Sequence, residues 1–331
     1  MIVTRRAALA AAAASFTAPL LGGAQAQAQA RWQMAVPYPD GNYHTRNIRE
    51  WLAELEASSA GRINVQLHSN GSLLGMPAIK RGVQQGQVQL GEILLTAYSN
   101  EESMFDADAI PFLVDDFAAA RRLAELQKPY IEQRLARQGL MLLYTVPWPA
   151  AGFYTNVPLD SLDVLKGSRF RTYSPMTNRF ATLVGATPTL VQAAELAQAF
   201  ATGVVQAQVT SAQTGVDTSA WDYCKIFTPT GFTMTKNAVF MSRRAFQTLS
   251  AEDQALVRAT AAQAETRGYR YAEEAQAAAE AKLQEKGMAR GTIPPAVMAD
   301  LKKISDTMAA EWVEKTGEDG RKLLAAYRAS A

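Results

Sequence analysis

Residues 31–75, RWQMAVPYPDGNYHTRNIREWLAELEASSAGRINVQLHSNGSLLG, decide the fold class of this chain. The short apolar segment 32–36 is typical of a buried strand. Residues 44–59 then place apolar side chains at the spacing i, i+3, i+4 and i+7, which indicates an amphipathic helix. Residues 62–68 alternate between apolar and polar side chains and predict a second strand. The stretch is therefore a strand–helix–strand unit.

The same order of helix and strand recurs along the rest of the chain. A helix followed by a strand is predicted in residues 77–96 and again in residues 115–146. Beyond Gly152 the pattern restarts, with strands and helices alternating over residues 160–211 and once more over residues 238–250. Alternation of this kind predicts an α/β fold in which helices cover a sheet.

Length and pattern together predict two domains. The chain has 331 residues, of which 48% are hydrophobic, and that length favours about two domains. We expect the chain to cross between them near residues 148–156 and 235–242. The predicted division is residues 31–152 plus about 239–268 for domain I, and residues 153–238 plus about 269–331 for domain II.

Residues 251–286 predict an unusually long helix. The segment has no proline, a single glycine at Gly268, and many strong helix formers. Ser250 is a suitable N-terminal cap. About 36 residues at 1.5 Å each would span about 54 Å, which is more than one domain. We expect either a strut along both domains or a break at Gly268. A coiled coil is disfavoured because Ala-rich faces make a poor seam.

The first 30 residues predict an export signal. Arg5 and Arg6 give a charged start, an apolar run follows, and AQAQAQA offers small-residue cleavage sites, most simply after Ala30. The arginine pair behind Thr4 resembles a twin-arginine signal, so the route, Sec or twin-arginine, stays open. We therefore expect residues 1–30 to be a signal peptide and the mature protein to be periplasmic.

The charge balance argues against a polyanionic partner. The formal net charge is +2, and two of the 33 basic side chains, Arg5 and Arg6, lie in the predicted signal, where there is no acid. The remainder has 31 basic and 31 acidic side chains. A nucleic acid would need a basic face, so no nucleic acid partner is expected.

Residues that usually carry catalysis or bind metals are few. The two histidines, His44 and His68, stand in no HExxH arrangement, so no metal site is predicted. Cys224 lies near Trp221 and Phe227, which predicts a buried apolar side chain rather than a nucleophile. The sequence also lacks phosphate-binding glycine motifs and a nucleophile elbow. We expect no cofactor.

A two-domain exported α/β chain without a catalytic motif suits a clamshell receptor. A cleft between two domains can bind a small solute through a few polar groups and an apolar wall, and hinge segments let the domains close. Two other classes stay open. An exported sensor domain would have the same cleft. A secreted hydrolase or lyase would need cleft carboxylates, such as Glu92, Asp106 and Asp108, as acid and base.

Three segments resemble a known family. LKGSRFR (165–171), GATPTLV (185–191) and ELAQAFATGVVQAQVTS (195–211), in this order, are similar to the solute-binding proteins of tripartite ATP-independent periplasmic (TRAP) transporters, the DctP-type family. The resemblance covers nearly all of the mature chain. It implies a two-domain clamshell fold with a long helix spanning both domains. The positions that keep the family pattern are Gly167, Arg171, Gly185, Ala186, Pro188, Glu195, Ala199, Gly203 and Val205.

The sequence also departs from that family pattern. Ala197 stands where the family often has Tyr, and Gln206-Ala207 stands where it has Asp-Gly. The sialic-acid type has a second carboxylate-binding arginine at the position of Ala151 and a ligand-contacting asparagine at that of Thr210. The resemblance therefore implies the fold and the transport role, but not sialic acid as the ligand.

By this resemblance Arg171 is the arginine that clamps the ligand. Its planar guanidinium presents paired donors that fit a carboxylate, and partial burial strengthens each bond. Arg169 lies two residues earlier and shares a face with Arg171 in an ideal strand, but the family has a surface Lys there. The alternative role for Arg171 is a salt bridge between the domains.

The positions of three further residues, two in the second half of the chain and one at the first crossing between the domains, predict that they contact the ligand. Thr210 and Ser211 end a predicted strand, where side chains meet the mouth of a cleft. Trp148 lies at the first crossing and could stack on a ligand, although a core position fits it as well.

Three residues of the first half are expected there on similar grounds. Glu92 follows a predicted strand and could hold a hydroxyl or an amine of the ligand. Tyr38 and His44 flank the first strand–helix loop, which is a usual position for cleft residues.

The predicted function is that of an extracytoplasmic receptor. It would bind a small organic acid between its domains and deliver it, as a monomer, to the membrane subunits of a TRAP transporter, as the resemblance implies. No catalysis, cofactor or metal is needed. The carboxylate is inferred from Arg171, and the sequence does not identify the acid.

Overall fold

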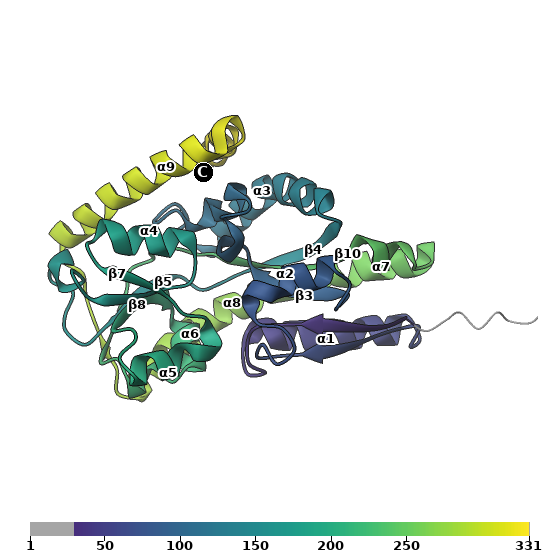
Figure 1. The fold of residues 1–331 in the computed structure, drawn as a ribbon, viewed down its shortest axis with the longest axis horizontal. Helices are drawn as coiled ribbons and strands as arrows, with labels where there is room; N and C mark the ends of the chain where they lie inside the picture. The colour runs from purple at the N-terminus through teal and green to yellow at the C-terminus, as the bar shows by residue number, and fades with distance from the viewer. Residues whose placement is uncertain (1–29, 331) are drawn as a thin grey trace, which may run out of the picture.

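The computed structural model describes residues 30–330, so the predicted signal peptide, apart from its last residue, lies outside the described residues. Two sheets with helices beside them make up this part of the chain (Figure 1). The predicted α/β class is confirmed. Within the same range no helix is long and apolar enough to cross a membrane.

The first sheet contains the N-terminal strands and one late strand. In the described residues its strands are β1 (Ala30–Ala35), β2 (Ile63–His68), β3 (Leu90–Leu94), β4 (Leu140–Pro147) and β10 (Lys236–Ser242). Their order is β2-β1-β3-β10-β4. β1 is parallel to β2 and β3, and β10 is antiparallel to β3 and β4. β3 is therefore a central strand, covered by neighbours on both edges.

The second sheet is formed by the middle of the chain. Its strands are β5 (Ala151–Thr155), β6 (Arg169–Thr172), β7 (Thr187–Leu190), β8 (Ala207–Ser211), β9 (Ile226–Pro229) and β11 (Ala289–Arg290). Their order is β11-β9-β5-β8-β6-β7, and β6 is parallel to both β7 and β8. We call the parts of the chain around the first and second sheets lobe I and lobe II.

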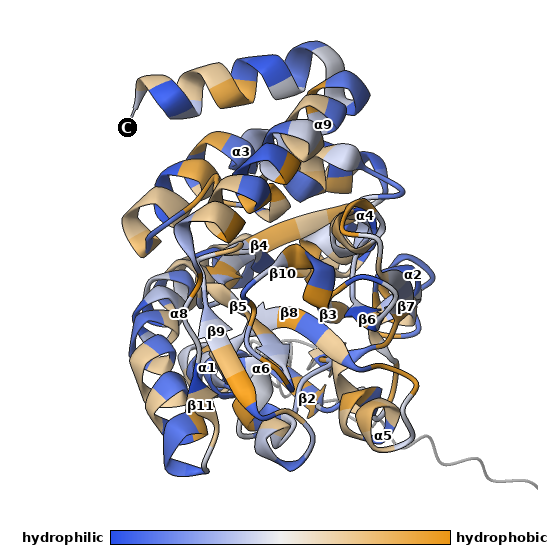
Figure 2. Ribbon diagram, turned by 90° about the vertical axis from the view of Figure 1, so that its left-hand side faces the viewer, coloured by the Kyte–Doolittle hydropathy of each residue, from blue (hydrophilic) through white to orange (hydrophobic). Residues whose placement is uncertain are grey.

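Helices of very different lengths pack beside the sheets. They are α1 (Tyr43–Ser58), α2 (Met76–Gln84), α3 (Phe117–Arg137), α4 (Pro175–Leu183), α5 (Leu196–Ala201), α6 (Ala212–Asp217), α7 (Arg243–Gln247), α8 (Ala251–Glu285) and α9 (Pro295–Ala329). Short 3-10 turns are η1 (Leu95–Tyr98), η2 (Ser103–Ala109), η3 (Leu162–Val164), η4 (Ala193–Glu195) and η5 (Ala220–Asp222). Figure 2 shows apolar colour along β4 and β9 and mixed colours on α3 and α8. This is expected for strands in the interior and for helices with one solvent-exposed face. Cys224 is buried, as predicted.

The chain passes between the sheets in two short connections and a third time along α8, which leads from β10 to β11. Residues 148–150 join β4 to β5, and residues 230–235 join β9 to β10. The first connection lies within the predicted range. The second comes earlier than the predicted residues 235–242, because nearly all of those residues form β10 itself.

A further junction between the lobes, at η2, was not predicted from the sequence. In η2, Phe105 belongs to the core of lobe I, whereas Met104 belongs to the core of lobe II. The predicted division gave all of residues 31–152 to one domain. The turn η2 contacts both cores, so the two lobes are joined here as well as at the two connections and along α8.

The long helix α8 runs unbroken past both sheets (Figure 1). It packs on α1 and β4 in lobe I and on α6 in lobe II. A Cβ at Gly268 would lie 2.4 Å from Val146 Cγ2 and 2.9 Å from Asn47 Nδ2, so the glycine lets α8 lie close against β4 and α1. The predicted strut is confirmed, and the alternative break at Gly268 is wrong.

Polar caps fix where α8 and α1 begin. Ser250 Oγ accepts a hydrogen bond from the backbone N–H of Asp253 at 3.1 Å, which confirms the predicted cap of α8. Asn42 Oδ1 accepts from the backbone N–H of His44 at 2.8 Å and caps α1. The cap of α1 holds the start of this helix beside the space between the lobes.

Candidate functional site

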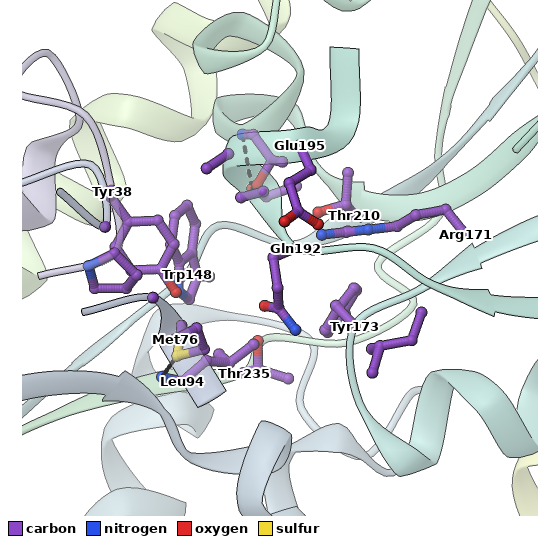
Figure 3. A pocket seen from close by; sticks show the side chains of 18 of the residues that line it. Tyr38, Met76, Leu94, Trp148, Arg171, Tyr173, Gln192, Glu195, Thr210 and Thr235 are labelled. Carbon is purple, nitrogen blue, oxygen red and sulfur yellow. Dashed lines mark hydrogen bonds between the residues drawn. The ribbon is translucent and has the colours of Figure 1, made fainter. Parts of the chain in front are cut away.

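A cavity of about 420 Å³ lies between the lobes. Tyr38 and Met76 line it from lobe I, Arg171 and Thr210 line it from β6 and β8 of lobe II, and Trp148 lines it from the first connection. Figure 3 shows Tyr38 and Trp148 on one side of the cavity and Arg171 on the other. A small molecule held there would contact both lobes at once.

Arg171 reaches the cavity because of its place on β6. Its neighbour Phe170 points into the core of lobe II, so the alternation of the strand sends Arg171 to the opposite face. Arg171 Nε donates to the carbonyl of Val191 at 2.9 Å, and the guanidinium carbon lies 4.8 Å from the ring centre of Tyr173. Nε is the one guanidinium nitrogen that hydrogen-bonds to another described residue, which leaves the two terminal nitrogens for a ligand.

The guanidinium of Arg171 is a buried charge without a counter-ion in the described chain. The side chain is 3% exposed, and burial lowers its pKa to about 10, so it remains a cation at neutral pH. None of the ion pairs within residues 30–330 includes it, so the alternative role as an inter-domain salt bridge finds no acidic partner. Desolvation of an unpaired cation costs several kcal/mol, which an anionic ligand would offset.

Arg169 has a different environment at the outer end of β6. It is exposed, and its Nε donates to the carbonyl of Gly203 at 2.7 Å. It does not line the cavity. The two arginines of one strand therefore divide into a surface residue and a cavity residue.

Thr210 and Ser211, at the end of β8, both line the cavity. Ser211 Oγ accepts from the backbone N–H of Thr214 at 3.2 Å and caps α6, so its hydroxyl already serves the fold. The hydroxyl of Thr210 makes no hydrogen bond to another described residue. Of the two, Thr210 has the free hydroxyl.

An aromatic wall, which we define as Tyr38 and Trp148, faces Arg171 across the cavity. The two rings meet edge to face, with centroids 5.0 Å apart and planes at 68°. Their polar atoms turn to the same acceptor, because Trp148 Nε1 donates to Asn237 Oδ1 at 2.8 Å and the Tyr38 hydroxyl donates to it at 3.4 Å. The wall therefore lines the cavity with two aromatic rings, and both of its polar hydrogens are directed to Asn237.

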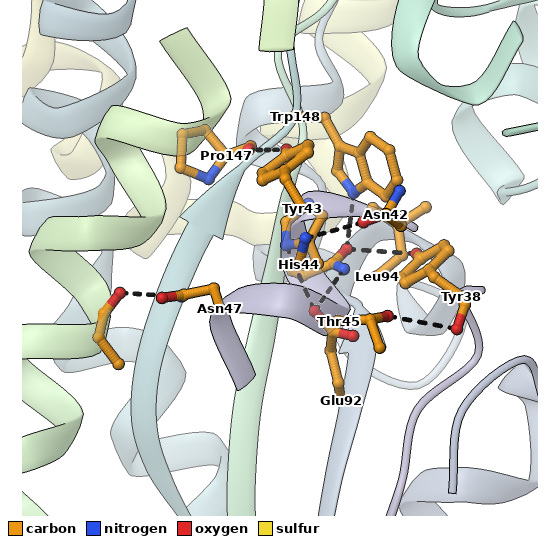
Figure 4. A network of polar contacts seen from close by, with 12 residues as sticks. Tyr38, Asn42, Tyr43, His44, Thr45, Asn47, Glu92, Leu94, Pro147 and Trp148 are labelled. Atoms are coloured by element: carbon orange, nitrogen blue, oxygen red, sulfur yellow. Dashed lines mark hydrogen bonds and ion pairs between the residues drawn. The ribbon is translucent and has the colours of Figure 1, made fainter. Parts of the chain in front are cut away.

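Glu92 and His44 lie behind the aromatic wall and do not line the cavity (Figure 4). Each is 1% exposed, and His44 Nδ1 lies 3.3 Å from Glu92 Oε1. Asn237 Nδ2 donates to the same carboxylate oxygen at 2.9 Å. Both were predicted at the cleft surface. Glu92 is covered instead because β3 is a central strand between β1 and β10.

Several cavity residues escaped the sequence analysis. Tyr173 follows Arg171 by two residues, so the alternation of β6 was a signal that could have found it. Thr233 and Thr235 line the cavity from the second connection, which the sequence analysis placed a few residues later. Asn237 sits on β10 beneath the cavity, and no local pattern marks it.

The carboxylates considered for acid–base chemistry do not gather at the cavity. Asp106 accepts a hydrogen bond from the hydroxyl of Thr96, and Asp108 pairs with Lys236 at 2.8 Å. Neither lines the cavity. In the described part of the chain, no cluster of His, Cys, Asp and Glu has the arrangement of a metal site.

A family model and a curated relative match most of the chain. The model of the bacterial extracellular solute-binding proteins, family 7 (DctP), matches residues 35–316. The ectoine/5-hydroxyectoine-binding periplasmic protein UehA of Ruegeria pomeroyi is 25% identical over 324 residues, which covers 94% of this chain and 93% of UehA.

Two solved receptors of Bordetella pertussis are similar along the chain. DctP7 is 42% identical with a TM-score of 0.89, and DctP6 is 38% identical with a TM-score of 0.88. Each comparison covers 90% of this chain and 99% of the other. Both are extracytoplasmic solute receptors binding pyroglutamic acid.

Proposed function

Because the chain belongs to family 7 of the bacterial extracellular solute-binding proteins, the DctP family of TRAP transporter receptors, we propose that it captures a small organic acid in the periplasm and delivers it to the membrane subunits of a TRAP transporter. The observation that carries the proposal is Arg171, a buried cation at a cavity between two lobes with no carboxylate partner in residues 30–330. A ligand carboxylate would supply that partner through paired hydrogen bonds.

Within the organic acids we propose pyroglutamate, a five-membered lactam with a carboxylate, as the ligand. Two relatives that are 38% and 42% identical bind it. The cavity suits such a molecule, because Arg171 can hold the carboxylate while Tyr38 and Trp148 pack against the small ring. Thr210 has a hydroxyl free for a further hydrogen bond.

The other predicted site residues have supporting roles in this proposal. Ser211 lines the cavity but uses its hydroxyl to cap α6. Glu92 and His44 act from behind the aromatic wall rather than on the ligand. No catalytic step is proposed, because Glu92, Asp106 and Asp108 do not reach the cavity.

Ectoine is the second candidate ligand, because UehA is a relative along almost the whole chain. Ectoine is a cyclic carboxylate that also carries a delocalised positive charge. Its carboxylate could pair with Arg171, but its positive charge would need a carboxylate partner from the protein. Glu195 lines the cavity and could serve, so we include ectoine in the test.

The test is a titration of the purified mature protein with L-pyroglutamate, its primary amide, ectoine and galacturonate. We expect L-pyroglutamate at 100 times its Kd to stabilise the protein by about 2.7 kcal/mol. The amide keeps the ring but lacks the anion and should bind far more weakly. Arg171→Gln should abolish binding, whereas Arg169→Gln, on the same strand but at the surface, should not.

Two results would contradict the proposal. One is an unfolding temperature that no organic acid changes. The other is unaltered pyroglutamate affinity in Arg171→Gln. A pull-down with the membrane subunits separates a transport receptor from an exported sensor, and sedimentation tests the proposed monomer.

A further inference from the structure

Behind the aromatic wall, one amide is held between a carboxylate and two aromatic donors. Asn237 Nδ2 donates to Glu92 Oε1 at 2.9 Å. Asn237 Oδ1 accepts from Trp148 Nε1 at 2.8 Å and from the Tyr38 hydroxyl at 3.4 Å. Figure 4 shows Tyr38, Trp148 and Glu92 converging on this place. All of these side chains are buried, so water does not offer replacement partners.

The direction of the Asn237 amide is fixed by chemistry. An ionised carboxylate only accepts hydrogen bonds, and an indole N–H only donates them. The amide nitrogen must therefore face Glu92, and the amide oxygen must face Trp148. In the reverse orientation, Asn237 Oδ1 would face the acceptor Glu92 Oε1, and Asn237 Nδ2 would face the donor Trp148 Nε1. Each buried group left without a partner would cost about 1–3 kcal/mol.

The fixed amide also fixes the polarity of the Tyr38 hydroxyl. Burial, with a further contribution from Glu92, raises the pKa of Tyr38, so the hydroxyl keeps its proton. That proton is directed to Asn237 Oδ1. With its proton toward Asn237 Oδ1, the Tyr38 hydroxyl has lone pairs left for a ligand, so the aromatic wall favours a ligand that donates a hydrogen bond over one that accepts it.

We propose that Asn237, oriented by Glu92, is a positioning residue that makes Tyr38 an acceptor and so selects ligands with a ring N–H. The inference rests on the proposed function, in which Arg171 holds the carboxylate on the opposite side of the cavity. The ring then faces Tyr38. A lactam N–H satisfies the hydroxyl oxygen, whereas a lactone places its ring oxygen against another acceptor.

The experiment compares L-pyroglutamate with its lactone isostere, 5-oxotetrahydrofuran-2-carboxylate, by titration calorimetry. The two acids share the carboxylate and the ring carbonyl and differ in N–H against O. We expect wild type to bind the lactam at least about tenfold more tightly, as expected for one hydrogen bond lost to an unsatisfied acceptor. Tyr38→Phe should lower the affinity for the lactam and bring the ratio of lactam to lactone affinity close to one.

Glu92→Gln tests the orienting role, because the glutamine amide can present either a donor or an acceptor to Asn237, which leaves only Trp148 to hold the Asn237 amide in one direction. The lactam-to-lactone ratio should then fall severalfold. This ratio is the informative quantity, since a variant that merely loosens the fold weakens both acids alike. Tyr271→Phe, at a half-buried position of α8 outside the cavity, and Glu274→Gln, at an exposed one, are matched controls that should keep the wild-type ratio.

The outcomes separate the two proposals. If wild type binds neither acid, the proposed ligand is wrong and the inference falls with it. If wild type binds both acids equally, or if Tyr38→Phe keeps the wild-type preference, the inference is overturned while the proposed function stands. If Glu92→Gln does not fold, the Tyr38→Phe ratio alone decides.

Discussion

Arg171 at the cleft and Lys236 at the base of lobe I are both buried cations, each 3% exposed, but they are partnered differently. Lys236 Nζ donates to Asp108 Oδ2 at 2.8 Å and to Gln127 Oε1 at 2.5 Å. Arg171 contacts a backbone carbonyl and an aromatic ring, and no carboxylate of the described chain pairs with it. Lys236 is neutralised within the fold, whereas Arg171 has no such counter-charge in the described chain, as expected if a ligand supplies it.

The difference follows from where the two side chains lie. Lys236 begins β10, directly after residues 230–235 enter lobe I, and Asp108 belongs to η2, which contacts both cores. Their ion pair therefore ties the second connection to the junction at η2. Arg171 lies on the wall of the cavity, where a permanent partner would compete with the ligand. We therefore expect the partnered charge to stabilise the fold and the unpartnered charge to bind the ligand.

The largest expected effect comes from removing the cleft cation with Arg171→Met. Carboxylate affinity should fall at least about 1000-fold, or about 4 kcal/mol, because the ligand anion loses its buried partner. The free energy of unfolding of the unliganded protein should change by no more than about 1 kcal/mol, since relief of desolvation offsets one lost hydrogen bond. Calorimetry and urea denaturation measure the two quantities. A stability loss as large as the binding loss would contradict the comparison.

Replacing the buried, paired cation Lys236 should have the opposite effect, a large loss of stability and a small change in ligand affinity. Lys236→Met leaves Asp108 buried without a cation and should lower the free energy of unfolding by about 3 kcal/mol. Ligand affinity of the folded variant should stay within about tenfold of wild type, because Lys236 does not line the cavity. Urea denaturation gives the first number and calorimetry the second.

The double variant Lys236→Met, Asp108→Asn is the control for that prediction. It removes both charges, so it should recover part of the lost stability. A double variant that is less stable than Lys236→Met alone would show that the ion pair is not the cause.

A smaller, pH-dependent effect is expected at Asp106, two residues from Asp108 in η2. Asp106 has a hydroxyl partner and no cation within ion-pair distance in the described residues, and burial raises its pKa to about 7. A carboxyl with a pKa near 3.9 in the unfolded chain and near 7 in the fold stabilises the fold below pH 4, and this contribution is lost as pH rises to 7.

Asp106→Asn removes that titration. The stability of Asp106→Asn relative to wild type should therefore increase by about 2 kcal/mol between pH 5 and pH 8. Urea denaturation at several pH values measures it, with the exposed Asp300→Asn as a control that leaves the pH dependence unchanged. A stability difference that does not vary with pH would refute the assignment.

The sequence predicted the parts of this molecule that depend on local pattern. Strand and helix periodicity predicted the α/β class, and composition predicted the whole of α8 with its Ser250 cap. Arg171 was found because a family resemblance pointed to it, and the alternation of β6 explains its orientation. These features are encoded within about 40 neighbouring residues.

The features that escaped prediction join distant parts of the chain. Asn237 and Glu92 are 145 residues apart, and neither has a local motif that announces the other. Glu92 was predicted at the cleft because the sequence shows that it lies on a strand, but not that β10 inserts beside that strand. The contact of η2 with both cores escaped for the same reason.

The smallest expected effect concerns a hydrogen bond that crosses the cleft. Asn42 Nδ2, at the start of α1 in lobe I, donates to Asp217 Oδ2, at the end of α6 in lobe II, at 2.6 Å. Asn42→Ser keeps a capping hydroxyl for α1 but loses the amide donor. Because the bond joins the two lobes, we propose that it stabilises the closed cleft, and we expect ligand affinity to fall about fivefold, or about 1 kcal/mol, when it is lost.

A double-mutant cycle with Asp217→Ala separates this bond from the cap. If the bond is the cause, Asn42→Ser should cost little affinity in the Asp217→Ala background. An equal loss in both backgrounds would assign the effect to α1 itself. If both predictions hold, Arg171→Met and Asn42→Ser differ by about 3 kcal/mol in their effect on binding. That order is expected if the charge of Arg171 provides most of the affinity and the bond between the lobes adds a small part.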